Sequence, residues 1–380
     1  MLKKITLGYL VFLLVIFALA EFIANENPII IYNQEEWHFT LFSGMEESME
    51  ADFRLVFTPL PYSSQNQDYS NLNLKPFSSQ GKHYLGTDHL GRDLLANLIY
   101  GGRTSLLVGI IAIAITTLAG VLLGGLAGFL GDNGVKLSVS FSLGMIVAVM
   151  PAYYYAVYLR QFTIKESFLT STWEAVYQIS ISLLVALMFF VIGYLAHLVL
   201  RKVKYFNHKF FFPLDLLVLK LIEIFTSIPG LFLILALVSV FRPSLVLFAF
   251  IIAITSWTGL ARLIRAEMIK IRGQSFIEAA QALGLKPLVI FWRHALPNTF
   301  GLIVVYFTFG LSATIVIEST LSFIGAGIPP GVTSWGKLLA GFSFSNWWQT
   351  LIIAIVVIAT ILAIHYLGRI LESRYNPQSN

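Results

Sequence analysis

The chain has 380 residues, of which 57% are hydrophobic and only 12% charged, and its mean hydropathy is +0.77. About a quarter of the residues of an ordinary soluble domain are charged, so this composition excludes such a domain and indicates a protein embedded in a bilayer. The chain contains no cysteine, which excludes disulfides, thiol catalysis and cysteine-based metal sites. A net charge of +5 is too small to indicate a nucleic-acid partner.

The first apolar run, residues 5–23, follows two lysines. It is long enough to cross the hydrocarbon core as a helix, which predicts an N-terminal transmembrane anchor at 1–24. The alternative is a cleaved signal peptide, because Ala-Leu-Ala at 18–20 resembles a cleavage site after a basic start. We favour the anchor, since the many later spans need a first orientation in the membrane.

A polar segment, residues 25–83, separates this run from the others. Its short strand-like apolar pieces predict an extracytoplasmic segment with some β structure. Each of the following apolar runs has about the length of a helical span. With the first run they give eight predicted spans, at 5–23, 104–130, 136–159, 175–200, 214–241, 244–261, 297–324 and 348–368.

The cations orient these spans. If the N-terminus is cytoplasmic and the spans alternate, the basic block at 201–209 and the cations of the segment 262–296 lie in the cytoplasm. The short outer loops then hold few cations, as the positive-inside rule requires. The sequence therefore predicts a multi-pass membrane protein, in contact with lipid, whose N-terminus is cytoplasmic.

The cytoplasmic stretch EAAQALGLKPLVIFWRHALPN, residues 278–298, carries the strongest local signals. Good helix formers lead to Gly284, a natural helix stop, and Lys286-Pro287 suits the start of a second short helix. Leu296-Pro297-Asn298 is expected to turn the chain back into the membrane. The stretch predicts a surface helix–turn–helix, although an amphipathic connector resting on lipid headgroups fits the same pattern.

This stretch resembles the EAA loop of ABC-importer permeases. In that family the loop, here 262–296, forms the coupling helix that docks into a groove on the ATPase subunit. Two further stretches, 85–109 (LGTDHLGRDLLANLIYGGRTSLLVG) and 318–339 (ESTLSFIGAGIPPGVTSWGKLL), resemble permeases of dipeptide and oligopeptide importers, the peptide/nickel group. The residues that match the EAA loop are Glu278, Ala279, Ala280, Gly284, Leu296 and Pro297.

The resemblance implies an all-α polytopic fold with a six-span permease core. It covers 1–24, an outer amphipathic segment with the second span at 84–132, and residues 214–377 of a core at 214–380. Residues 133–213 depart from the family pattern and are expected to form an inserted hairpin of two spans. An even number of added spans leaves the later loops on their own side of the membrane.

For function, the resemblance implies a permease subunit of an ATP-driven importer in the bacterial cytoplasmic (inner) membrane, forming half of the pore for peptides or similar small solutes. The implied partners are two ABC ATPase subunits, a second homologous permease and an extracytoplasmic substrate-binding protein. The chain would be no enzyme and bind no cofactor, because Mg-ATP would be held by the ATPase subunits. The alternative is a secondary transporter or channel without ATPase partners, which would predict two matched halves that the sequence lacks.

Several residues within the spans have two interpretations. Gly120, Gly124 and Gly128 have the spacing of close helix contacts in lipid, either inside this subunit or against a second permease. Pro229 is expected to kink its span and, by the resemblance, to lie near the translocation path as a candidate gate. Lys220 with Glu223 fits a snorkelling pair.

Two candidate sites, one for a metal ion and one for ATP, are rejected. The spacing of His83, Asp88, His89 and Asp93 fits no single helix face, and Thr87 or Asp88 is better placed as a helix cap, so no metal site is predicted. Residues 331–337 have the glycine spacing of a P-loop, but a leucine follows where a serine or threonine would hold Mg²⁺. No ATP site is therefore predicted in this chain.

Overall fold

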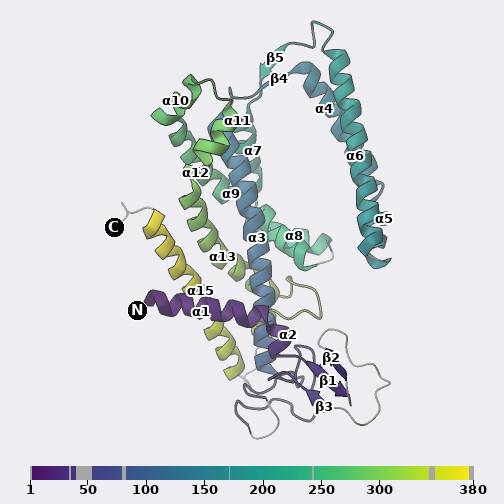
Figure 1. The fold of residues 1–380 in the computed structure, drawn as a ribbon, viewed down its shortest axis with the longest axis vertical. Coiled ribbons are helices and arrows are strands. Elements are labelled where there is room, and N and C mark those ends of the chain that lie inside the picture. Colours follow the sequence, from purple (N-terminus) through teal and green to yellow (C-terminus); the bar gives the residue numbers. More distant parts are fainter. Residues whose placement is uncertain are drawn as a thin grey trace. The chain divides into compact units, whose positions relative to one another are not determined.

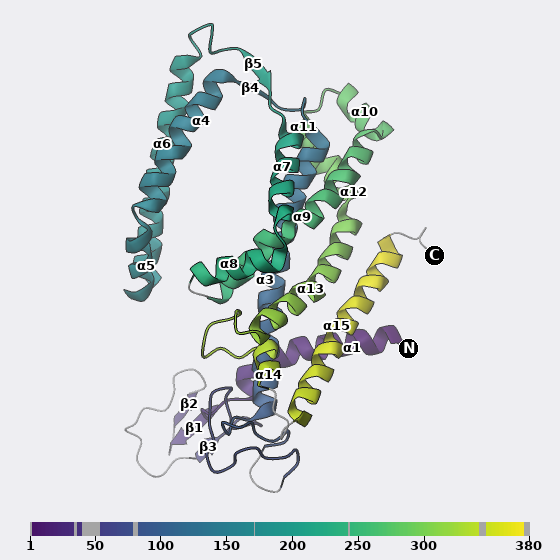
Figure 2. The same ribbon diagram turned by 180° about the vertical axis from the view of Figure 1, so that it is seen from behind.

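The computed structural model describes residues 2–33, 36–39, 54–78, 83–170, 172–241, 244–341 and 347–375. Across them the chain is dominated by helices, which confirms the all-α polytopic class (Figures 1 and 2). The contacts divide the chain into two compact units, one of residues 1–129 with 220–380 and one of residues 130–219. Among the described residues, six helices are long and apolar enough to cross a membrane, or seven if a bent pair counts as one span.

The eight spans predicted are therefore not all confirmed. The first apolar run forms α1 (Leu2–Ala18) and, after a break at Leu19, α2 (Ala20–Ile23). At 17 residues, α1 is shorter than the about 20 residues that an untilted span needs. It packs on the last helix, α15 (Trp347–Tyr375), where Tyr9 Oη and Thr360 Oγ1 lie 3.1 Å apart.

The predicted segment at 25–83 contains β structure, as expected. Three short strands form an antiparallel sheet in the order β2-β1-β3. The central strand pairs Ile31 with His38 on one side and with Leu55 on the other. The remainder of the predicted segment lies partly outside the described residues. The strands are β1 (Ile30–Asn33), β2 (Glu36–Phe39) and β3 (Arg54–Val56).

The helix α3 (Leu94–Leu130) joins two elements that the sequence analysis separated. Its 37 residues include the second span and the later part of the outer segment that was predicted from residue 84. The first turns are not a surface element, because Leu94 and Leu98 are buried. Trp335 of α14 (Trp335–Ala340) is also buried there and donates its indole N–H to the Leu98 carbonyl oxygen, at 3.1 Å.

The later helices differ from the predicted spans mainly at their ends. The helix α9 (Leu245–Arg272) continues well past the predicted end at residue 261. The predicted span at 214–241 is broken into α7 (Leu214–Ser227) and α8 (Gly230–Val240), bent by 83°. The span at 297–324 is formed mostly by α13 (Phe300–Phe323).

Residues 130–219 form a helical hairpin of their own. The helices α4 and α6 pack closely, since a Cβ atom on Gly144 would lie 2.5 Å from the Gly193 carbonyl oxygen. The predicted span 136–159 begins with a strand, which pairs with a second strand after α6. Its tyrosines lie exposed on a π-helical turn. The elements are β4 (Lys136–Ser138), α4 (Val139–Ala152), η1 (Tyr153–Tyr158), α5 (Gln161–Thr170), α6 (Thr172–Leu200) and β5 (Lys209–Phe211).

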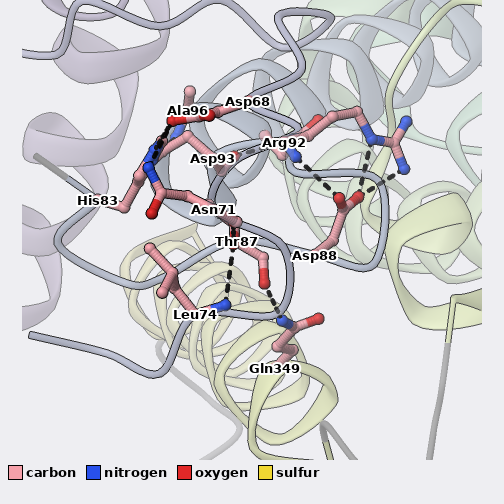
Figure 3. Close-up of polar contacts among 11 residues, drawn as sticks. Asp68, Asn71, Leu74, His83, Thr87, Asp88, Arg92, Asp93, Ala96 and Gln349 are labelled. Atoms are coloured by element: carbon pink, nitrogen blue, oxygen red, sulfur yellow. Dashed lines mark hydrogen bonds and ion pairs between the residues drawn. The ribbon is translucent and has the colours of Figure 1, made fainter. Parts of the chain in front are cut away.

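A polar cluster fixes the outer end of α3 (Figure 3). Asp93 caps the helix, because its Oδ1 accepts the Ala96 N–H at 2.7 Å. The prediction of Asp88 as helix cap is wrong: its Oδ1 accepts the Leu90 and Arg92 N–H groups, both at 2.9 Å, in the preceding turn. An aspartate carboxylate can accept hydrogen bonds from the backbone N–H groups of a turn as well as from those of a helix start. The spacing of the residues alone does not show which of the two Asp88 contacts.

The same cluster connects distant parts of the chain. The Thr87 hydroxyl donates to the Asn71 carbonyl oxygen and accepts the Leu74 N–H, so it cross-links the outer loop rather than capping a helix. Gln349 of α15 donates its side-chain N–H to the Thr87 carbonyl oxygen at 2.6 Å. The starts of α3 and α15 are thereby held to one loop (Figure 3).

His83 lies at the centre of this cluster. Its Nδ1 is 2.9 Å from Asp93 Oδ2 and its Nε2 is 3.5 Å from Asp68 Oδ2. Burial raises the pKa of Asp93, whereas hydrogen bonds from Ser70 and Asn71 lower the pKa of Asp68 to about 2. The imidazole therefore links the loop that precedes α3 to the cap of that helix.

We predict that His83→Ala loosens the outer segment. The variant leaves the fully buried Asp93 carboxyl without its imidazole partner, and removing one member of a buried pair costs about 3 kcal/mol. Limited proteolysis from the outer side and the melting temperature in detergent measure the change. His89→Ala is the control, because His89 lies exposed in the same segment. Equal protease resistance of the two variants would contradict the role given to His83.

Candidate functional site

The stretch after α9 folds into the helix–turn–helix that the sequence predicts. The first helix ends in a pair of capping hydrogen bonds, from Gly284 N–H to the Gln281 carbonyl (2.9 Å) and from Leu285 N–H to the Ala280 carbonyl (3.3 Å). This pairing is a Schellman motif, and it needs the left-handed φ of +76° found at Gly284. The elements are α10 (Ser275–Ala282), α11 (Pro287–Ile290), η2 (Phe291–Ala295) and α12 (Leu296–Asn298).

The second short helix, α11, starts at the predicted residue, but the chain does not turn where the sequence predicts. Lys286 is the N-cap and Pro287 the first residue of α11, where a missing N–H costs nothing. Leu296-Pro297-Asn298 was predicted to turn the chain, but these residues are helical and continue the π-helical turn toward α13. The turn prediction was wrong because proline is tolerated in a first helical turn.

One face of this coupling segment, defined here as residues 273–299, is packed against the transmembrane helices. Ile277, Ile290 and Phe291 are fully buried. The Phe291 ring lies 5.8 Å from the Phe129 ring of α3, and a Cβ atom on Gly125 would lie 3.2 Å from it. The coupling segment is therefore seated on the end of α3.

Several large apolar side chains of the coupling segment are exposed. Leu283 is 80% exposed, Leu288 54% and Trp292 52%. Charged side chains of the segment, Glu278, Lys286 and Arg293, are exposed as well. The predicted site residues divide between the two faces: Ala280 is buried and Leu296 half-buried, whereas Glu278, Ala279, Gly284 and Pro297 are exposed.

The glycine row of α3 lies against α9. A Cβ atom on Gly124 would lie 2.2 Å from the Ala261 carbonyl oxygen, and one on Gly128 would lie 2.4 Å from the Arg265 carbonyl oxygen. At Gly120 the nearest atoms belong to Leu260, at 2.9 Å. The two backbones approach each other only because these positions lack a Cβ. The described contacts of the row are thus within this chain.

Pro229 lies where the span 214–241 breaks. It precedes α8 as its N-cap, with φ −56° and ψ 128°, and the axes of α7 and α8 differ by 83°. The predicted kink is therefore a full break. A row of polar side chains on α7 could not be recognised from the sequence, because their common direction depends on which face of the helix packs.

One ion pair lies close to the coupling segment. Lys270 and Glu267 form an exposed pair at 3.6 Å near the end of α9. Within the described ranges, no group of three or more His, Cys, Asp or Glu side chains could hold a metal ion.

Comparison with known proteins places the chain. Residues 205–377, which include the coupling segment and Pro229, match the family described as binding-protein-dependent transport system inner membrane component. The chain is 25% identical to the dipeptide transport system permease protein DppC of Bacillus subtilis, with 93% of this chain and 88% of that protein covered. It is 24% identical to the oligopeptide transport system permease protein OppC of Haemophilus influenzae, with 84% and 77% covered.

A shorter match agrees with these. The oligopeptide transport system permease protein OppC of Salmonella typhimurium is 32% identical over 168 residues, 43% of this chain and 56% of that protein. Proteins of this family are the membrane components of ABC transporters and are not themselves catalytic. The matched region and the transmembrane helices support an inner-membrane permease of an ABC importer, and the chain is similar to permeases of the dipeptide and oligopeptide group.

Proposed function

We propose that this chain forms half of the translocation pore of an ATP-driven importer for peptides or similar small solutes, and that its coupling segment docks on a cytoplasmic ATPase subunit. The observation that carries the proposal is the two-faced coupling segment. Its buried face is seated on α3, and its exposed face presents large apolar side chains such as Leu283. A partner that covers this face would remove it from water.

Because α3 packs on α9, a displacement of the coupling segment is passed on to both helices. Close-packed interiors have low compressibility and transmit displacement instead of absorbing it. Phe291 fits against α3, and the glycine row locks α3 to α9, which leads directly into the segment. Movement of a docked ATPase would therefore displace α3 and α9 together.

The remaining partners follow from the same proposal. A second, homologous permease completes the pore, and two ATPase subunits bind and hydrolyse Mg-ATP in the cytoplasm. A substrate-binding protein delivers solute to the extracytoplasmic side, where the segment 25–83 lies. The N-terminus is then cytoplasmic. The family description, which names dependence on a binding protein, supports this arrangement.

A secondary transporter or channel is the competing function. The break between α7 and α8 favours it, because such proteins build binding sites from broken helices. They use such breaks in two matched halves, however, and the described residues contain one bent pair.

Purification of the chain in mild detergent separates the two functions. We predict that ATPase subunits and a second permease are recovered with it, and that the complex reconstituted in liposomes transports solute only with ATP. A chain that purifies alone and transports without ATP would instead be a secondary transporter or channel.

We further predict that Gly284→Val uncouples ATP hydrolysis from transport. A β-branched residue at a φ of +76° is strained by about 1–2 kcal/mol, which distorts the capping turn between α10 and α11. The ATPase rate and solute uptake of reconstituted complexes are compared. The control is Gly273→Val in the same segment, because Gly273 has an ordinary φ of −87°. Coupled transport by the Gly284 variant at the control's level would count against the role of the segment.

A further inference from the structure

The helix α7 carries polar side chains on the face that points away from its packing partners. Lys220, Glu223 and Ser227 follow the i, i+3, i+7 spacing of one helix face, and all three are exposed. Ile222 is 1% exposed on the opposite face, and Phe225 contacts Trp257 of α9 edge to face, with ring centroids 5.8 Å apart. The outward side of this helix therefore carries these polar side chains beside exposed apolar ones, Leu216 (52%) and Ile224 (63%).

Lipid is an unsuitable neighbour for such a face. Charged side chains inside membrane spans almost always face the bundle interior or a water-filled cavity, because their transfer into hydrocarbon is expensive. The Lys220 and Glu223 side chains are 63% and 61% exposed, and their Nζ and Oε2 atoms lie 2.8 Å apart.

Snorkelling does not account for this pair. A snorkelling lysine extends toward the nearer end of its helix. Here the Lys220 ammonium group is bonded to the Glu223 carboxylate at 2.8 Å, so a second charged side chain would have to reach the membrane surface with it. The polar side chains also continue to the end of α7, beyond the reach of one snorkelling residue.

A cation from a second helix joins the row. Arg262 of α9, the first cation of the segment predicted to be cytoplasmic, donates to the Thr226 hydroxyl at 3.0 Å and is itself exposed, so the row begins at the predicted cytoplasmic end of the spans. The chain then becomes apolar at the break around Pro229, where Ile228 is 47% exposed and Phe232 65%. The polar stripe, defined as Lys220, Glu223, Thr226, Ser227 and Arg262, therefore ends at an exposed apolar step.

We propose that the polar stripe lines the water-filled path of the transported solute, and that the apolar residues after Pro229 form its constriction. The stripe offers two cations and one carboxylate, with two hydroxyls between them. This mixture complements a solute that carries both ammonium and carboxylate groups. The proposal rests on the proposed transport function, and it identifies residues of this chain that face the solute.

The absence of native cysteine allows a direct test. Ser227→Cys replaces one oxygen by sulfur on the stripe, and Ile224→Cys places a thiol on the neighbouring apolar flank, where Ile224 is 63% exposed. Both variants are prepared as full complexes in inside-out membrane vesicles. The probes are membrane-impermeant methanethiosulfonates, one cationic and one anionic.

We expect the thiol of Ser227→Cys to react with both probes at least about tenfold faster than that of Ile224→Cys, because only the stripe meets water. If the Ser227→Cys thiol is unreactive while an exposed thiol in Leu283→Cys reacts, the stripe is a dry contact with the second permease and the proposal fails. Equal rates for the Ser227 and Ile224 variants also overturn it, because the polar face would then have no special access to water.

This outcome is distinguishable from failure of the transport mechanism. A reactive Ser227→Cys in a chain that purifies without ATPase subunits keeps the stripe and removes the ATP-driven importer. An unreactive Ser227→Cys in a complex that contains the ATPase subunits removes the polar stripe from the solute path and keeps the ATP-driven importer.

Discussion

The close approach of α3 and α9 is the contact on which the rest of this permease depends. At Gly124 the two backbones leave no room for a Cβ atom, which would lie 2.2 Å from the Ala261 carbonyl oxygen. In lipid, helices associate through such tight packing, since the hydrophobic effect gives no preference for one apolar surface over another. The coupling segment then extends from the end of α9 and fits Phe291 back onto α3.

The helix α3, which packs tightly on α9, is long enough to cross a membrane. At about 1.5 Å per residue, its 37 residues reach from the coupling segment to the polar cluster around His83. There Asp93 caps the helix, and His83 ties the cap to the outer loop. Trp335 packs beside it, and the α15 residue Gln349 bonds to the same loop. One rigid helix thus connects the surface proposed for the ATPase with the side on which a binding protein would deliver solute.

Local signals in the sequence predicted local structure well. The stop at Gly284, the start at Pro287 and the break at Pro229 follow from backbone rules that depend on single residues. Helix ends were harder, because α9 continues to Arg272 through charged residues that the hydropathy of a span does not include. Packing keeps it helical, and packing is not visible in one sequence.

Directions of side chains were the least predictable. Whether Asp88 or Asp93 capped α3 depended on where the outer loop brought its amides. Whether Lys220 and Glu223 were a snorkelling pair or part of a longer polar face depended on which side of α7 packs on α9. These choices are set by tertiary contacts, so that pattern alone left them open.

The most direct test of the coupling segment is a cross-link from its exposed face. Leu283→Cys, in a chain without native cysteine and at a position that is 80% exposed, is treated in the assembled complex with a short thiol–amine cross-linker. The account predicts an adduct with an ATPase subunit, and none from Leu231→Cys, an exposed position on α8. A complex that contains the ATPase subunits but gives no Leu283 adduct would contradict it.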